Sequence, residues 1–187
     1  MTLTAPTPKI AGKAVVGQKL TAGAGTWGPG SVSLRYQWLR GGTPISGATK
    51  TTYTPGVADA GYALSVRVTG TKRLYTTTAR TSAATGTVPL LTLTARPVPT
   101  ISGKALVGST LTAQTGTWAP APVALAYQWY RGGVAIGGAT RATYTITAAD
   151  AGSALTVAVT ATKTGYAPVT TQSKPSASVP RTLTGGT

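Results

Sequence analysis

The chain of 187 residues repeats itself at a shift of 91 residues. About three-fifths of positions 10–75 are identical to positions 101–166 without a gap. A unit of this length exceeds the roughly 20–45 residues of a solenoid repeat and has the size of a small independent domain. The repeat therefore predicts two copies of one domain in tandem. The matched motifs include Gly25-Thr26-Trp27 with Gly116-Thr117-Trp118, Tyr36-Gln37-Trp38 with Tyr127-Gln128-Trp129, and Asp59-Ala60-Gly61 with Asp150-Ala151-Gly152.

A second periodicity marks the joints between the copies. Thr-Leu-Thr occurs at residues 2–4, 92–94 and 182–184, a shift of 90. We expect the one-residue difference to be absorbed between Ala95 and Ile101, so that each unit includes its connector. The expected divisions are an N-terminal arm (1–8), a first domain (9–90), a second domain (91–180, with a linker at 91–100) and a C-terminal tail (181–187).

Within each unit, short runs alternate apolar and polar residues. In one run Leu34, Tyr36 and Trp38 point to one face, and the run 64–69 alternates in the same way. A side-chain period of two with one apolar face is typical of a half-buried antiparallel strand. Turns rich in Gly and Pro separate the runs, and no stretch has a helical period. About seven short strands per unit predict an all-β fold of two tandem β-sandwiches.

Two segments carry a resemblance to a known family. The run Tyr36–Ile45 resembles the third strand and following turn of an immunoglobulin-like domain, where a buried Trp precedes a basic residue, a Gly turn and a short hydrophobic strand. Asp59-Ala60-Gly61 resembles the acidic turn before that family's sixth strand, and both segments recur in the second copy. Over nearly the whole chain, the pattern is similar to immunoglobulin-like repeats of surface proteins of high-GC bacteria and virion proteins of their phages.

The chain also departs from antibody-type domains. It has no cysteine, so no disulfide can bridge the two sheets. The Tyr that the family usually carries four residues after the Asp is replaced by Ala63 and Ala154. Packing alone must hold each sandwich, and truncating a buried Trp to Ala would cost on the order of 3–5 kcal/mol. The expected core anchors are Trp38, Trp129, Tyr36 and Tyr127.

Charge is the strongest compositional bias. Seventeen Lys and Arg stand against two Asp, for a net charge of +15. Ten of the basic residues and one Asp lie in residues 1–90, giving +9, and seven with one Asp lie in residues 91–187, giving +6. Such a field attracts teichoic acids, acidic glycans, nucleic acid or an acidic protein surface. The alternative is a solvated basic face that keeps the protein soluble. Because no basic run is longer than Lys72-Arg73, we expect only non-specific affinity for nucleic acid.

Catalytic chemistry is not expected from this composition. There is no His and no Cys, and the two acids lie at equivalent positions of separate domains. General acid–base catalysis needs His or a tuned carboxylate, and a metal site needs several oxygen or imidazole ligands. We therefore expect no enzyme activity, no metal and no cofactor, and we interpret Asp59 and Asp150 as caps of the turns before their strands. Apolar runs are far shorter than the roughly 18 residues of a membrane span.

Aromatic residues near turns are the candidate contact residues. Trp27 and Trp118 lie in Gly-Thr-Trp segments before turns rich in Gly or Pro. Such residues either pack against the end of the sandwich or offer a stacking surface for sugar rings. The other candidates for a loop-end surface, near the turns between the sixth and seventh strands, are Tyr75, Tyr166, Lys72, Arg73 and Lys163.

Two functional hypotheses from different classes follow. In the first, the chain is a complete bacteriophage virion protein that decorates a capsid or tail surface, since it begins with Met and shows no secretory signal peptide. One domain would dock on the capsid or tail protein, by charge or by strand addition through Leu3, Leu93 and Leu183. The other would contact the host envelope weakly and multivalently.

In the second hypothesis, the chain is a piece of a secreted actinobacterial protein. Its domains would be extracellular spacers or would bind anionic cell-wall polymers or glycans. The two copies differ at positions that we expect to be exposed, and this divergence suits the first hypothesis, with one anchoring domain and one displayed domain. These pairs are Arg35 and Ala126, Arg67 and Ala158, and Arg73 and Thr164.

Overall fold

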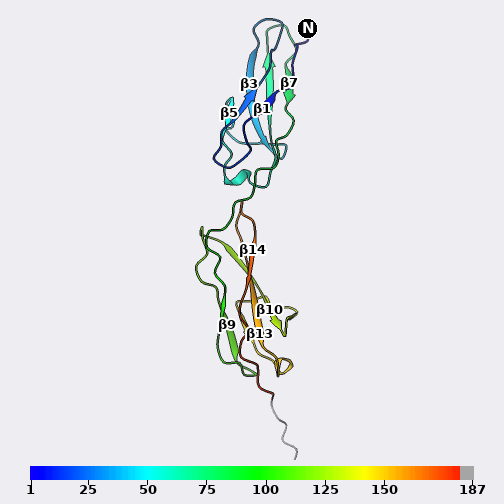
Figure 1. The fold of residues 1–187 in the computed structure, drawn as a ribbon. Coiled ribbons are helices and arrows are strands. Elements are labelled where there is room, and N and C mark those ends of the chain that lie inside the picture. Colours follow the sequence, from blue (N-terminus) through cyan, green and yellow to red (C-terminus); the bar gives the residue numbers. More distant parts are fainter. Residues whose placement is uncertain (182–187) are drawn as a thin grey trace, which may run out of the picture. The chain divides into compact units, whose positions relative to one another are not determined.

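A computed structural model describes residues 1–181 and divides the chain into two compact units, Met1–Leu91 (unit 1) and Thr92–Thr187 (unit 2) (Figure 1). Each unit pairs a three-stranded antiparallel sheet with a four-stranded one. The prediction of two tandem immunoglobulin-like sandwiches of seven strands each is confirmed.

Unit 1 has the strand order β1-β2-β5 in one sheet and β4-β3-β6-β7 in the other. A single 3-10 turn, η1 (Val57–Asp59), precedes the long central strand β6. The strands are β1 (Lys9–Ala11), β2 (Leu20–Gly23), β3 (Ser33–Arg40), β4 (Thr43–Pro44), β5 (Thr52–Tyr53), β6 (Leu64–Thr71) and β7 (Thr78–Thr81).

Unit 2 repeats this topology with the orders β12-β9-β8 and β11-β10-β13-β14. Its 3-10 turn, η2 (Ala148–Asp150), again precedes the central strand of the larger sheet. The strands are β8 (Thr100–Ser102), β9 (Thr110–Gln114), β10 (Ala124–Arg131), β11 (Val134–Ala135), β12 (Thr143–Thr145), β13 (Leu155–Thr162) and β14 (Val169–Gln172).

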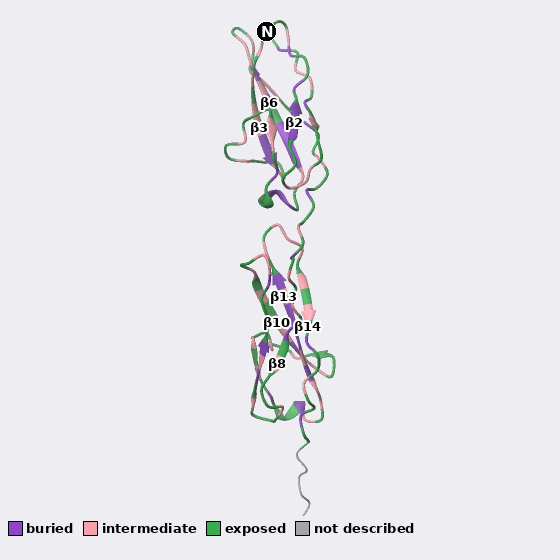
Figure 2. Cartoon of the chain, turned by 60° about the vertical axis from the view of Figure 1, so that its left-hand side comes forward, coloured by how far each residue is buried: buried purple, intermediate pink, exposed green. Residues whose placement is uncertain are grey.

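Each core lies between the two sheets and contains a fully buried Trp. In unit 1, Trp38 of β3 lies opposite Val66 of β6, and both have an exposed fraction of 0%. Trp129 and Val157 repeat this pair in unit 2. Tyr36 and Tyr127 are half-buried and pack against the same clusters. Figure 2 shows the buried residues gathered on the central strands β6 and β13.

The first residues of the chain belong to the core of unit 1, so the expected separate arm at 1–8 is wrong. Leu3 is 8% exposed and packs in one cluster with Trp27 and Val68. The backbone N–H of Thr4 donates to the carbonyl of Gly28 at 2.8 Å. An apolar side chain with a buried pocket beside it gains more from burial than from solvent exposure. This segment is therefore an extra edge of the sandwich.

Leu93 is the equivalent of Leu3 in unit 2, and it lies in the core of that unit with an exposed fraction of 2%. Here the backbone N–H groups of Thr94 and Ala95 both donate to the carbonyl of Ala119, at 2.8 and 3.3 Å. Two residues facing one partner form a bulge that accommodates one additional residue. The extra residue of the second copy therefore lies at Thr94-Ala95, and the expectation that it lies between Ala95 and Ile101 is wrong.

Beyond β7, hydroxyl groups complete the edge of the larger sheet. The backbone N–H of Val66 donates to the Ser82 hydroxyl, and that of Leu64 donates to the Thr85 hydroxyl, both at 3.0 Å. Ser173 and Ser176 do the same for β13. These hydroxyls satisfy buried donors on the central strand where the carbonyls of a regular ladder are not in place.

Candidate functional site

The larger sheet of unit 1 presents two arginines on its outer face. The strand register places Arg35 of β3 opposite Thr69 of β6, and Arg67 of β6 opposite Gln37 of β3. Opposite residues of an antiparallel pair share a face, so Arg35 and Arg67 are diagonal neighbours, roughly 7–8 Å apart at the backbone. Both side chains are exposed. We call Arg35 and Arg67 the basic face of unit 1.

Unit 1 has no carboxylate to neutralise this basic face. Asp59 is the one acid among residues 1–91, and its Oδ1 accepts a hydrogen bond from Nε of Arg40 at 2.7 Å. Asp59 is only 1% exposed, on the core side of the sheet. The field of the basic face therefore extends into solvent and attracts anionic groups.

Unit 2 lacks this charge at the equivalent positions. Ala126 lies opposite Thr160, and Ala158 lies opposite Gln128 on one side and Gln172 on the other. The expectation that all the divergent positions are exposed is wrong for Ala158, which is 8% exposed. Its methyl group is too short to extend beyond the longer glutamine side chains on the flanking strands. An arginine at this register position, as in unit 1, reaches solvent.

The β6–β7 turn of unit 1 brings together three of the predicted contact residues. Lys72 Nζ donates to the carbonyl of Pro29 at 2.7 Å and lies 5.7 Å from the centre of the Tyr75 ring. Tyr75 is half-buried against the Trp27 cluster, whereas Arg73 is exposed. The turn is thus held by a tethered lysine and a packed tyrosine.

The β13–β14 turn of unit 2 is tethered in the same way. Lys163 Nζ donates to the carbonyls of Ala121 and Pro122, at 3.3 and 2.9 Å, and lies 5.9 Å from the Tyr166 ring. Tyr166 is half-buried and packs against the core of its unit. Both tyrosines therefore serve mainly to hold their turns.

One exposed residue of the unit 1 turn was missed by sequence reasoning. Leu74 is 76% exposed and has a backbone φ of +67°. The aligned residue of the second copy is Gly165, with φ of +79°. The alignment of Leu74 with Gly165 could have predicted the positive φ of Leu74, because a position that one copy fills with Gly often requires positive φ.

Of the two alternatives for Trp27 and Trp118, packing against the end of the sandwich is confirmed, and a sugar-stacking surface is wrong for both. Their exposed fractions are 7% and 4%, so neither ring offers a face to solvent. Trp27 Nε1 donates to the carbonyl of Ala24 at 3.0 Å. The Gly-Thr-Trp segments fold inward because the indole closes the open end of the core.

The Thr-Leu-Thr segments are also used within their own units. The side chains of Leu3 and Leu93 are buried in the two cores and are not available to a partner, while strand addition through the backbone of these segments stays a prediction. The third such residue, Leu183, lies outside the described residues.

Each Asp is the centre of a buried polar cluster that holds the fold. Asp59 Oδ2 accepts hydrogen bonds from the Tyr53 hydroxyl and from the backbone N–H of Gly56, both at 2.7 Å, while Oδ1 binds Arg40. The predicted capping of the turn is thus one of three contacts. Burial and the bond to Asp59 raise the pKa of Tyr53 to about 12.

The same cluster occurs in unit 2. Asp150 binds Arg131 and Tyr144, and it accepts hydrogen bonds from both the backbone N–H and the hydroxyl of Thr147. Burial opposes ionisation of this carboxyl, but the hydrogen bonds outweigh burial and keep the pKa of Asp150 below its usual value. In both copies an Arg lies 19 residues and a Tyr 6 residues before the Asp, which was the sequence signal for the cluster.

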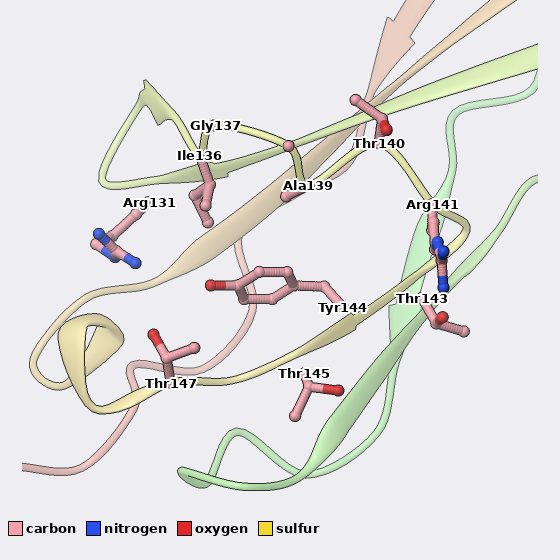
Figure 3. A pocket seen from close by; sticks show the side chains of 11 residues that line it. Arg131, Ile136, Gly137, Ala139, Thr140, Arg141, Thr143, Tyr144, Thr145 and Thr147 are labelled. Carbon is pink, nitrogen blue, oxygen red and sulfur yellow. The ribbon is translucent and has the colours of Figure 1, made fainter.

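A hollow of about 500 Å³ lies beside this cluster in unit 2 (Figure 3). The loop after β11 and strand β12 form its walls, and the Tyr144 ring lies between Ile136 and Thr145. A smaller hollow of about 300 Å³ lies at the same place in unit 1, beside Tyr53. Because the Tyr hydroxyl and Arg131 are already bound to the buried Asp, the hollow contains no free acid–base pair.

Two further features of the described residues concern clusters of metal-ligating side chains and membrane-spanning helices. Residues 1–181 contain no cluster of three or more His, Cys, Asp or Glu side chains. Within the same part of the chain, no helix has the length and apolar character needed to span a membrane. The two units differ in charge at the basic face and the adjoining turn of unit 1.

Comparisons with known proteins concern the fold. Neither a protein-family model nor a curated protein matches the chain. Solved structures with a similar fold include the D1–D4 ectodomain fragment of ICAM-5 (18% identity, 89% of this chain and 53% of that one, TM-score 0.39). Two others are Sidekick-1 immunoglobulin domains 1–5 (18%, 90% and 39%, 0.32) and three N-terminal domains of the Highly Immunogenic Outer Capsid protein of bacteriophage RB49 (20%, 92% and 58%, 0.30). The chain spans about half the length of the ICAM-5 fragment.

Proposed function

We propose that this chain is a non-enzymatic attachment protein in which unit 1 docks on an acidic protein surface and unit 2 is displayed. The observation that supports this division is the charge difference on one sheet face: Arg35 and Arg67 in unit 1 stand where unit 2 has Ala126 and Ala158. Two units with the same core have no packing reason to differ there. Selection on an external contact accounts for the difference.

The setting that we propose is the surface of a bacteriophage virion, with a capsid or tail protein as the partner. Each unit keeps its fold without a disulfide, through its packed core and its buried Arg–Asp–Tyr cluster. Docking through a few arginines is weak for one copy, and many copies on a symmetric shell raise the avidity of the displayed unit for a host surface. Charge also accelerates encounter with an acidic shell.

A second candidate function is binding of an anionic cell-wall polymer in an extracellular protein. It is favoured by the basic residues that both units share, which would match a polymer with repeating charge. Apart from Arg40 and Arg131, which bind the two Asp residues, the shared pairs are Lys13 and Lys104, Lys50 and Arg141, and Lys72 and Lys163.

Co-sedimentation distinguishes the two candidates. The purified chain is mixed either with virus particles assembled without this protein or with isolated actinobacterial cell walls, before and after extraction of teichoic acid. The proposal predicts salt-sensitive binding to the particles. Binding only to walls that retain teichoic acid would favour the second candidate, and binding to neither would refute both.

A pair of double variants tests the basic face. R35A/R67A and K13A/K104A each remove two positive charges, but only the first removes them from the basic face. We expect R35A/R67A to weaken particle binding about 10- to 100-fold and K13A/K104A to change it by less than about 3-fold. Equal losses in the two variants would show that net charge alone drives binding.

A further inference from the structure

Leu74 combines two unfavourable features at one residue. Its backbone lies in the left-handed region, with φ of +67°, where an L-residue with a side chain is disfavoured. Its side chain is 76% exposed, so the leucine gains almost nothing from burial in its own unit. Leu74 is the one non-glycine residue with positive φ among residues 1–181.

The turn itself does not need this leucine. In unit 1 the backbone N–H of Tyr75 donates to the carbonyl of Lys72 at 3.1 Å. In unit 2, where Gly165 replaces the leucine, the equivalent bond from Tyr166 to Lys163 measures 3.0 Å. Glycine thus closes the same turn without strain. A residue with a strained backbone that the turn does not require points to a role other than stabilising the turn.

The turn that carries Leu74 is hydrogen-bonded to other parts of unit 1. Lys72 is tethered to Pro29, and the backbone N–H of Thr76 donates to the carbonyl of Met1 at 2.9 Å. Arg73, beside the leucine, is exposed. An exposed apolar side chain on a hydrogen-bonded turn, next to a cationic residue, can enter a pocket on a partner with little further ordering of the backbone.

The basic residues around Leu74 indicate which class of molecule would bind at this turn. Strand β3 begins at Ser33, opposite Thr71, so Arg35 lies near the same end of the sheet as the turn. With the unit's one acid bound to Arg40, the surroundings of Leu74 are cationic. Teichoic acid and nucleic acid offer charge but no apolar pocket for a leucine. An acidic protein surface with such a pocket matches both features.

We propose that Leu74 is the apolar anchor of unit 1 and inserts into an apolar pocket on an acidic protein partner. This inference rests on the proposed docking role of unit 1 and adds the residue that selects a protein over a polyanion. Unit 2, with Gly165, lacks the anchor.

The test uses the full chain and the variants L74G and L74N, since Asn tolerates positive φ and keeps the turn stiffer than Gly. Removing the strain is expected to raise the folded-to-unfolded ratio of unit 1 about 5- to 30-fold for L74G, measured by urea denaturation. Both variants are expected to bind particles assembled without this protein about 10-fold more weakly or worse. Binding to teichoic acid is expected to stay unchanged, because no charge is removed.

The outcomes separate this inference from the proposed function. Wild-type binding that L74G and L74N retain in full would overturn the anchor and leave the docking role intact. Failure of the wild-type chain to bind the particles would overturn both. A loss of binding by variants that are equally or more stable than the wild type cannot come from misfolding and would support the anchor.

Discussion

At the level of single residues, the two units accommodate the equivalent residues Trp27 and Trp118 in different ways. In unit 1 a Cβ on Gly70 would overlap the ring of Trp27, so the glycine lets that ring approach the backbone of β6. Unit 2 has the fully buried Ala161 at this position. Among the described residues, Trp118 Nε1 is buried without a hydrogen-bond partner, whereas Trp27 Nε1 binds the Ala24 carbonyl.

This difference predicts unequal costs for the same substitution. W27F loses a buried hydrogen bond together with ring volume, whereas W118F loses ring volume and removes an unsatisfied donor. We expect W27F to be the more destabilising variant by about 1 kcal/mol or more. Urea denaturation of both variants measures the difference, and a W118F variant at least as destabilised as W27F would contradict it.

The pH dependence of unit 1 is also set by single residues. The pKa of Tyr53 is raised to about 12 by burial and by Asp59, against an ordinary value of about 10. The folded state therefore holds this proton more tightly than the unfolded state. The resulting stability is complete below pH 10 and is lost as the pH rises from about 10 to about 12.

Y53F is expected to lower stability at neutral pH, because Asp59 loses a hydrogen bond, and to flatten the decline between about pH 10 and 12. Urea midpoints measured across this range test the difference from wild type. Y62F serves as the control, since Tyr62 is 51% exposed. A Y53F profile parallel to the wild-type profile would refute this account.

At the element scale, the N-terminal segment acts as a strand-like edge of unit 1. Leu3 contributes to the Trp27 cluster, and Thr4 pairs with Gly28. A hydrophilic arm would carry no such residue. The sequence does not predict this edge, because three residues of alternating Thr and Leu are too short for periodicity to show which side is buried.

L3A is therefore expected to destabilise unit 1 by about 2–5 kcal/mol, the usual cost of truncating a buried leucine. L90A is the matched control, because Leu90 is 46% exposed and its truncation is expected to cost about 0.5 kcal/mol or less. Thermal or urea unfolding distinguishes the two. Similar small effects would show that the N-terminal segment contributes little to the core.

At the scale of the whole molecule, each unit has its own core, its own Trp and its own Arg–Asp–Tyr cluster. We expect residues 1–91 and 92–187, expressed separately, each to unfold in one cooperative transition. Circular dichroism during heating provides the measurement. A piece that lacks a transition would show that its stability depends on the other unit.

Features that depend on local pattern and on repetition can be predicted from the amino-acid sequence. The shift of 91 residues predicted two units, and the period of two along β3 and β6 predicted which of their residues face the core. These predictions succeed because side-chain direction along a strand follows from backbone geometry alone. The absence of cysteine likewise left packing around Trp38 and Trp129 as the means of holding each sandwich.

Features that depend on contacts between residues distant in the chain become apparent only in the folded protein. Burial of Trp27, Trp118 and Leu3 follows from the space left at the ends of the sandwich, which a linear pattern does not encode. Arg35 and Arg67 are 32 positions apart in the sequence and become diagonal neighbours only through the β3–β6 register. The repeat thus specified two copies of one core, while strand pairing within the larger sheet brought the two arginines of unit 1 together on its surface.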